Sequence, residues 1–294
     1  MCFKATAETF PKLHAVSYNT INLDHITSVM SSIQLVQLRE LTIGCQAPLA
    51  QGTLRNFLEE LSTSCPDITS VALCLTRAEE IATTPITFGD LEPMLQCHNI
   101  AKFKIIHDLP IEIVWEEDLT RMGKAWPFLH NLKLCPDPHP DHCNPQLGMP
   151  IQALAQASIH LFHLEVLSGF LSNDIGQLPV NFALHNLCEL NVGFSKVPAR
   201  DVQKTGVVIG SFCRSFCKIR FGSQWGSLHQ PPPWAEEAEG EWRLVEELAR
   251  IVGDSLVPIW REEDYLRETV EDLQQSTTAI PQAENDKGAL ALIR

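Results

Sequence analysis

The chain has 294 residues, of which 45% are hydrophobic and 20% are charged, so it can form a large core and is not a disordered protein. Acidic residues number 36 against 22 basic ones, and the formal net charge is -14 at pH 7. This charge disfavours nucleic acids and anionic membranes as partners, because both require clustered lysine and arginine. No apolar stretch is long enough to cross a membrane or follows a basic start as in a secretory signal. We therefore expect a cytoplasmic or nuclear protein whose 10 cysteines are reduced thiols.

A short pattern of apolar residues recurs along the chain and predicts its strands. The pattern has the form Φ-x-x-Φ-x-Φ, where Φ is apolar, and successive copies begin 25 to 32 residues apart. Side chains alternate within each copy, which is typical of a short β-strand with one buried face. The eight copies begin at Leu13, Leu38, Ile68, Ile100, Leu129, Leu161, Leu187 and Phe216.

Helical segments precede several of these strands. For example, Leu54, Phe57, Leu58 and Leu61 fall on one stripe of a helix. A single helix–strand unit cannot bury its own apolar face, so neighbouring units must stack and bring their strands side by side. The sequence therefore predicts an α/β solenoid of horseshoe shape over residues 1–223, with about eight units, parallel strands on the concave face and helices outside.

Two runs within these units resemble the irregular leucine-rich repeats of fungal F-box proteins. They are Cys-Pro-Asp-Ile-Thr-Ser-Val-Ala-Leu at 65–73 and Trp-Pro-Phe-Leu-His-Asn-Leu-Lys-Leu at 126–134, and the resemblance covers about residues 10–270. In that family an N-terminal F-box binds a cullin ubiquitin ligase through an adaptor, while the repeats hold the target. The resemblance implies a substrate receptor in ubiquitin ligation. It implies the ligase adaptor as a partner only if an F-box lies upstream, since no recognisable F-box precedes the first repeat.

Side chains between the apolar positions of each strand are predicted to line the concave face. In the middle of the chain they form a small basic patch, followed by a more acidic one. We interpret this face as the binding surface for a protein partner, because a pre-organised surface binds without a large ordering cost. The alternative is that these side chains are only the solvated face of the strands. The candidate partner-binding residues are Lys102, Lys104, Asn131, Lys133, His163, Glu165, Glu189 and Asn191.

The C-terminal part of the chain differs from the repeats. Residues 224–234 contain three consecutive prolines and are expected to form a loop. Residues 235–272 carry 13 acidic and 4 basic residues, a net charge of -9, and Trp242 begins a stripe of helical spacing. This pattern predicts an acidic helix that caps the open end of the last repeat, or alternatively one that recruits a partner. Residues 273–294 lack such a stripe and are predicted to be a disordered tail.

One cluster offers possible metal ligands. Cys135, His139, His142 and Cys143 could bind zinc, but their spacing is not that of a common zinc site and three prolines restrict the segment. We therefore favour no metal site and expect no cofactor. The chain also lacks the Gly-x-Ser-x-Gly, phosphate-loop and His-Glu-x-x-His motifs.

These patterns together predict a non-enzymatic protein-interaction module. Two alternatives stay open. One is a stand-alone leucine-rich-repeat scaffold or sensor unrelated to ubiquitin. The other, more remote, is a metal-dependent enzyme built around residues 135–143.

Overall fold

The computed structural model describes residues 13–20, 22–31, 37–46, 49–75, 84–136, 138, 148–172, 184, 186–213, 216–222 and 234–278, with only the backbone described at 155 and 257–278. The chain forms two compact units, Met1–Gly253 and Asp254–Arg294.

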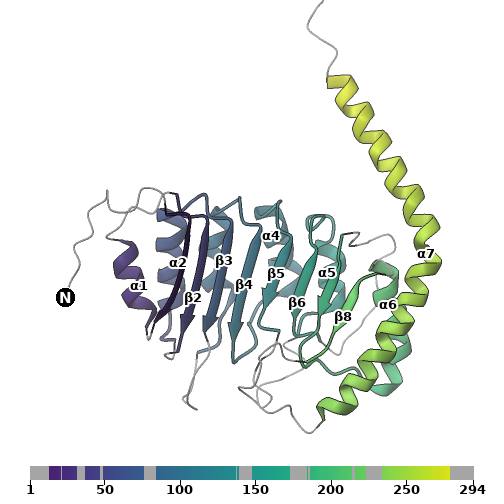
Figure 1. Cartoon of the computed structure of the whole chain (residues 1–294), viewed down its shortest axis with the longest axis horizontal. Coiled ribbons are helices and arrows are strands. Elements are labelled where there is room, and N and C mark those ends of the chain that lie inside the picture. Colours follow the sequence, from purple (N-terminus) through teal and green to yellow (C-terminus); the bar gives the residue numbers. More distant parts are fainter. Residues whose placement is uncertain are drawn as a thin grey trace, which may run out of the picture. The chain divides into compact units, whose positions relative to one another are not determined.

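The first unit is built on one open sheet of eight parallel strands, whose order in space follows their order in the chain (Figure 1). This arrangement confirms the expected α/β class and the parallel sheet. The strands are β1 (Ala15–Thr20), β2 (Glu40–Cys45), β3 (Ser70–Leu75), β4 (Lys102–His107), β5 (Asn131–Leu134), β6 (Val166–Gly169), β7 (Glu189–Asn191) and β8 (Lys218–Arg220).

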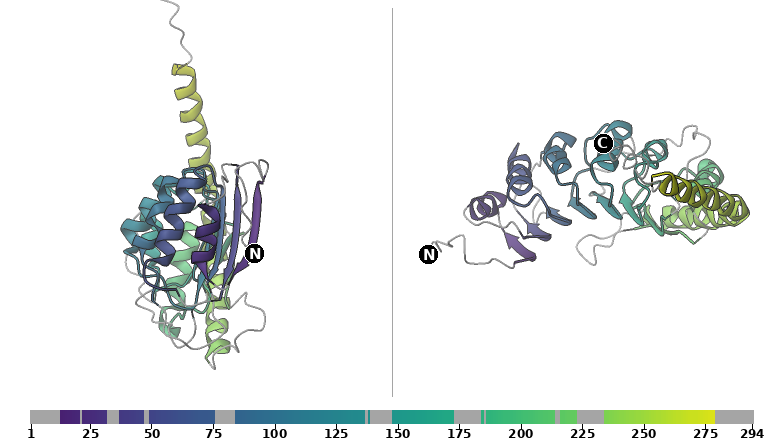
Figure 2. Two further views of the ribbon diagram at one scale, coloured as in Figure 1. Left: turned by 90° about the vertical axis from the view of Figure 1, so that its left-hand side faces the viewer. Right: turned by 90° about the horizontal axis from the view of Figure 1, so that it is seen from above.

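Helices cover one face of this sheet (Figure 2). The apolar stripe of the second helix is buried against the sheet, as its spacing predicts, with Leu54, Phe57, Leu58 and Leu61 all at most 3% exposed. Within the first unit, the other face of β1 to β5 carries no described helix. The helical elements on the covered face are α1 (Leu23–Met30), α2 (Thr53–Ser64), α3 (Phe88–Leu91), η1 (Glu92–Gln96), α4 (Trp115–Ala125), α5 (Ile151–Ala157), η4 (Ala199–Asp201) and α6 (Val202–Phe212).

The same turn precedes strand after strand. In each case a backbone N–H donates to the carbonyl oxygen three residues earlier, with N···O distances of 3.0 to 3.3 Å, and both residues are buried. The recurrence of one hydrogen bond shows that the units are similar modules. The bonds run from Ile68 to Cys65, Ile100 to Cys97, Leu129 to Trp126, Leu164 to Leu161 and Leu187 to Leu184.

The register of β6 differs from the sequence prediction. Val166 lies opposite Asn131 on β5 and Glu189 on β7, so the apolar pattern of this unit begins at Leu164 and not at Leu161. Leu161 instead occupies the turn before the strand. Leu161, Leu164 and Leu167 follow each other at intervals of three residues, so the apolar pattern fits two frames and cannot distinguish them. The other seven frames agree with the strand pairing.

The last helix, α7 (Ala235–Thr278), begins in the first unit and covers the edge of the sheet at β8. Trp242 and Val245 are buried there, and the indole Nε1–H of Trp242 donates to the Ser195 carbonyl at 2.8 Å. The Glu246 carboxylate accepts the Ile219 N–H at 3.1 Å, and so takes the place that a ninth strand's carbonyl would occupy. These contacts hold the first part of α7 against the edge of the sheet at β8.

Glycines allow α6 to approach this helix closely. A Cβ atom at Gly210 would lie 2.5 Å from the Ala249 carbonyl oxygen, and one at Gly206 would lie 2.6 Å from the Leu248 Cβ. Both distances are shorter than any normal contact, so only glycine fits.

In the second unit, the described residues are the remainder of α7, which continues past 272 to Thr278. The glutamines at 274 and 275 favour helix, which suits this extension.

Candidate interaction surface

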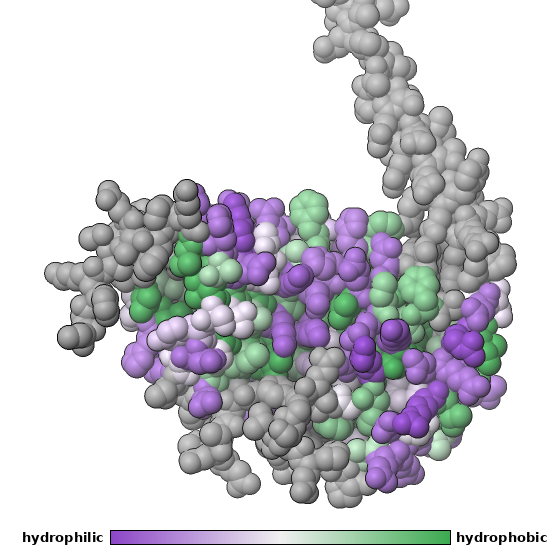
Figure 3. Space-filling model, in the orientation of Figure 1, coloured by the Kyte–Doolittle hydropathy of each residue, from purple (hydrophilic) through white to green (hydrophobic). Residues whose placement is uncertain are grey.

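The candidate surface is the face of the sheet that α1 to α6 leave uncovered. Its side chains alternate along each strand with the buried apolar ones, so they project away from the helices. Figure 3 views this face and shows hydrophilic and hydrophobic residues mixed across it. The strand register aligns the side chains in two rows. The first is Ala15, Glu40, Ser70, Lys102, Asn131, Val166, Glu189 and Lys218, and the second is Ser17, Thr42, Ala72, Lys104, Lys133, Ser168, Asn191 and Arg220.

The structure brings the predicted basic residues together on β4 and β5. Lys102 lies opposite Asn131, and Lys104 lies opposite Lys133. Lys102 is exposed, whereas Lys104, Asn131 and Lys133 are half-buried. Within the described residues, Lys102 and Lys104 form no ion pair. Lys102, Lys104 and Lys133 therefore lie close together on β4 and β5 and make this part of the face basic.

The surroundings of this basic patch differ on its two sides. On β3, the residues opposite Lys102 and Lys104 are Ser70 and Ala72, whose side chains are much shorter than those of the lysines. On β6, Ser168 is 0% exposed, and its Oγ has no hydrogen-bond partner among the described residues. On β7, Asn191 is 1% exposed. The second row is therefore interrupted at β6 and β7, and the lysines of β4 and β5 lie next to this interruption.

The predicted acidic neighbour of this patch is not on the sheet face. His163 and Glu165 lie in the turn before β6, because that strand begins one apolar position later than expected. Both are exposed, and the His163 ring packs edge-on against Phe162 at 5.2 Å between centroids. Val166 and Ser168 occupy the two positions on the sheet face that were expected for His163 and Glu165.

The remaining two candidates make contacts within the fold. The Glu189 carboxylate forms an ion pair with the Arg220 guanidinium at 3.0 Å. The Asn191 side-chain oxygen accepts the Gly193 N–H at 2.9 Å. Since both polar groups are already satisfied, Glu189 and Asn191 are less available to a partner than the lysines are.

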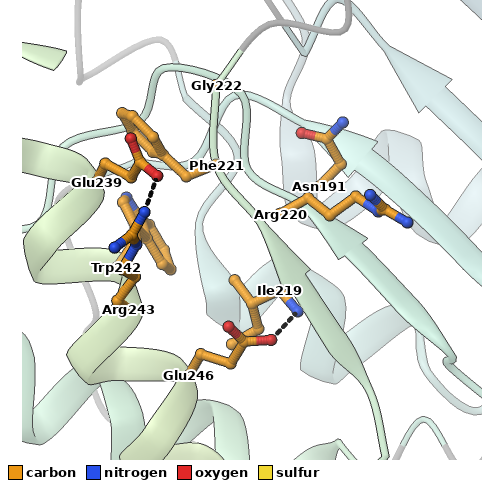
Figure 4. A pocket seen from close by; sticks show the side chains of 9 residues that line it. All are labelled: Asn191, Ile219, Arg220, Phe221, Gly222, Glu239, Trp242, Arg243 and Glu246. Carbon is orange, nitrogen blue, oxygen red and sulfur yellow. Dashed lines mark hydrogen bonds and ion pairs between the residues drawn. The ribbon is translucent and has the colours of Figure 1, made fainter. Parts of the chain in front are cut away.

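A cavity of about 360 Å³ lies between the end of the sheet and α7 (Figure 4). Sequence reasoning missed it, because it is formed by β7, β8 and α7, which the chain brings together only in three dimensions. Its charged lining residues are Arg220, Arg243, Glu239 and Glu246, two of each sign; Arg243 contacts Glu239 at 2.7 Å, and Glu246 accepts the N–H of Ile219. The cavity is therefore polar but locally neutral, and its side chains hold the helix against the sheet.

The possible zinc ligands fall mostly outside the described residues, where His139, His142 and Cys143 lie. Cys135 is described; it is buried directly after β5, and its N–H donates to the Ile105 carbonyl at 2.9 Å. Within the described ranges, no group of three or more histidine, cysteine, aspartate or glutamate side chains could hold a metal ion.

Two cysteines of the repeats are core residues. Burial raises the pKa of the Cys65 thiol from 9.0 to about 12 and that of the Cys97 thiol to about 11. A smaller part of each increase comes from neighbouring groups, Cys97 and Glu60 for Cys65 and Asp67 for Cys97. Such thiols stay protonated at neutral pH and are poor nucleophiles.

No family model and no curated protein matches this chain. Among the described residues, no helix has the length and apolarity needed to cross a membrane.

Proposed function

We propose that this protein is a non-enzymatic protein-interaction module that binds a partner protein on the uncovered face of its sheet. The fold would be a leucine-rich-repeat-like solenoid with this face on its concave side, and the protein would act in the cytoplasm or nucleus. The observation that carries the proposal is the pair of in-register rows of side chains across β1 to β5. A rigid sheet holds such rows in place before binding, so little conformational entropy is lost when a partner binds.

The resemblance to the repeats of F-box proteins supports a more specific role. In that role the partner on the sheet face is the target of a cullin-type ubiquitin ligase, and this chain is the substrate receptor. The alternative is a stand-alone repeat scaffold or sensor that binds the same kind of partner without a ligase.

A matched pair of variants tests the binding face. Thr42→Trp places a large side chain on the uncovered face, and Asn56→Trp places the same side chain on α2 of the helix-covered side; both positions are exposed. Exposed substitutions change stability by only about 0.5 kcal/mol, so both variants should fold, which circular dichroism would check. We expect affinity purification followed by mass spectrometry to reveal a partner that Asn56→Trp keeps and Thr42→Trp loses. A purified partner that bound both variants equally would contradict the proposal.

Co-purification of the cullin adaptor separates the two roles. The substrate-receptor role predicts that the adaptor purifies with the protein expressed from its complete gene, and that the partner is ubiquitinated only when this protein is present. Partner binding without the adaptor would instead support the stand-alone scaffold.

A further inference from the structure

We propose that the open edge of β1 pairs with the same edge of a second copy of this chain, so that the two sheets join into one. β1 is the first strand of the sheet, and among the described strands it has a hydrogen-bonded neighbour on one side only, β2. In the left view of Figure 2 this end of the sheet faces the reader. The inference does not depend on the proposed function, because this edge and the uncovered face are different surfaces.

The open edge of β1 carries a row of backbone groups that can pair with a strand. The His14 carbonyl accepts the N–H of Glu40 on β2 at 3.0 Å, so the even-numbered residues of β1 hydrogen-bond to β2. In a parallel pair, alternate residues direct both backbone groups to the same side. The N–H and C=O groups of Ala15, Ser17 and Asn19 therefore point away from the sheet, and all three residues are exposed. Such a row is a template for a further strand.

The two edges of the sheet differ in how well they are protected. β8 has only three residues, two of which are charged, and the N–H of Ile219 donates to the Glu246 carboxylate of α7. Short edge strands, charged side chains and a covering helix are the usual means by which proteins prevent strand addition. β1 has six residues, none of which is charged or proline, and no described strand pairs with its open edge. β1 is therefore suited to the pairing that β8 avoids.

The sequence of β1 is complementary to itself when two copies run antiparallel. If Ser17 lies opposite Ser17 of the second copy, then Ala15 lies opposite Asn19, and every outward-facing backbone group of both strands forms a hydrogen bond. Val16 and Tyr18 then form two cross-strand pairs, and a β-branched residue opposite an aromatic one is a favourable pair. The pairing would also cover Tyr18, which is 53% exposed in the single chain. A second copy thus satisfies both the backbone and the side chains of this edge.

The symmetry of this contact fits the layers of the fold. The two-fold axis would run through Ser17 and be perpendicular to the sheet, so the helices of both copies stay on one side. The uncovered faces of both copies then lie side by side on the other side of the joined sheet. A partner with two binding segments would be held by both faces at once, which strengthens its binding without any new contact.

The charge distribution allows the contact even though the chain has a net charge of -14. Residues 13–46, which include β1, α1 and β2, carry one arginine against one aspartate and one glutamate, a net charge of -1. The acidic first part of α7 covers β8, which is seven strand spacings from β1, or about 34 Å along the sheet. Exposed charges are largely screened beyond about 8–10 Å at physiological salt. The repulsion between two copies at this edge is therefore small.

Charge exchange at Ser17 tests the contact, because this exposed residue would lie opposite itself. Sedimentation of the full chain should show a dimer at micromolar concentrations. We expect Ser17→Lys and Ser17→Glu each to weaken the dimer about fivefold, since like charges would be directly opposed. An equimolar mixture of the two variants should form the dimer again, because opposite charges then meet. Thr42→Lys makes the same charge change at the neighbouring position of β2 and should leave the dimer intact.

Ser17→Pro provides a second variant that removes a hydrogen bond and adds no charge. Proline is tolerated on an edge strand where the N–H points outward, so the pairing of β1 with β2 is kept. We expect this variant to weaken the dimer about tenfold, because each copy loses one donor at the centre of the contact.

Several outcomes would overturn the inference. They are a wild-type chain that sediments as a monomer at micromolar concentrations, a dimer that tolerates Ser17→Pro, and a mixture of Ser17→Lys and Ser17→Glu that stays as weakly associated as each variant alone. A monomeric chain that binds the extended segment of another protein, and loses it with Ser17→Pro, would show that this edge has a different occupant and that the inference is wrong.

Discussion

Replacement of Trp242 should show how much α7 stabilises the end of the sheet. This side chain is only 3% exposed, and its Nε1–H donates to the Ser195 carbonyl at 2.8 Å. Replacing a buried tryptophan with alanine typically costs about 3–5 kcal/mol, since apolar contacts are lost and a cavity remains. Trp242→Phe keeps most of the apolar contacts but leaves the Ser195 carbonyl without its donor, so it should cost about 1–3 kcal/mol.

Urea denaturation followed by circular dichroism measures these differences in the free energy of unfolding. Leu244 provides the matched control, because it is on the same helix but 54% exposed, and Leu244→Ala should change the free energy by about 0.5 kcal/mol or less. Hydrogen exchange should also become faster in β8, which α7 covers. The reasoning would be refuted if Trp242→Ala and Leu244→Ala were equally stable and β8 exchanged at the wild-type rate.

Two further results are expected. Gly210→Ala should destabilise the fold by about 1–3 kcal/mol, because the new Cβ would lie 2.5 Å from a carbonyl oxygen of α7. A Cβ at Gly240 meets nothing within 4 Å, so Gly240→Ala should instead stabilise the helix by about 0.5–1 kcal/mol. Calorimetry on the two variants distinguishes the steric effect from the effect of helix propensity. The pKa of Cys65 is raised from 9.0 to about 12, so the folded state retains its proton longer than the unfolded state. The stability that this thiol contributes is therefore present below pH 9 and is lost as the pH rises from 9.0 toward 12. Cys65→Ala should flatten this decline in urea midpoints measured between about pH 8 and pH 10, and an unchanged slope would contradict it.

Much of the sheet could be predicted because the spacing of apolar residues within most units is enough to locate the strand. In the units containing Leu41, Val71, Phe103 and Leu132, apolar residues occur at positions that fit one strand frame, and the structure aligns them in register. The lysine patch followed from the same alternation. Its pairing did not, because only the register of β4 against β5 decides that Lys104 is opposite Lys133.

The spacing of apolar residues could not predict contacts between distant parts of the chain. The bond from Trp242 to Ser195 joins residues 47 positions apart, and the bond from Ile219 to Glu246 joins residues 27 positions apart. The stripe that includes Trp242 predicted that α7 would bury an apolar face, but not which groups it would meet. The placement of His163 and Glu165 failed for a local reason, since leucines at intervals of three residues fit two strand frames equally well.

Lysine acetylation footprinting tests most directly whether the partner binds on the uncovered face. Lys102 and Lys104 project from this face, whereas Lys124 is exposed on α4 on the opposite side. The protein would be acetylated with and without the partner defined by the Thr42→Trp comparison, and each lysine would be quantified by mass spectrometry. We expect the partner to protect Lys102 and Lys104 and to leave Lys124 unchanged. Protection of Lys124 with unchanged labelling of Lys102 and Lys104 would place the partner on the helices and contradict the account.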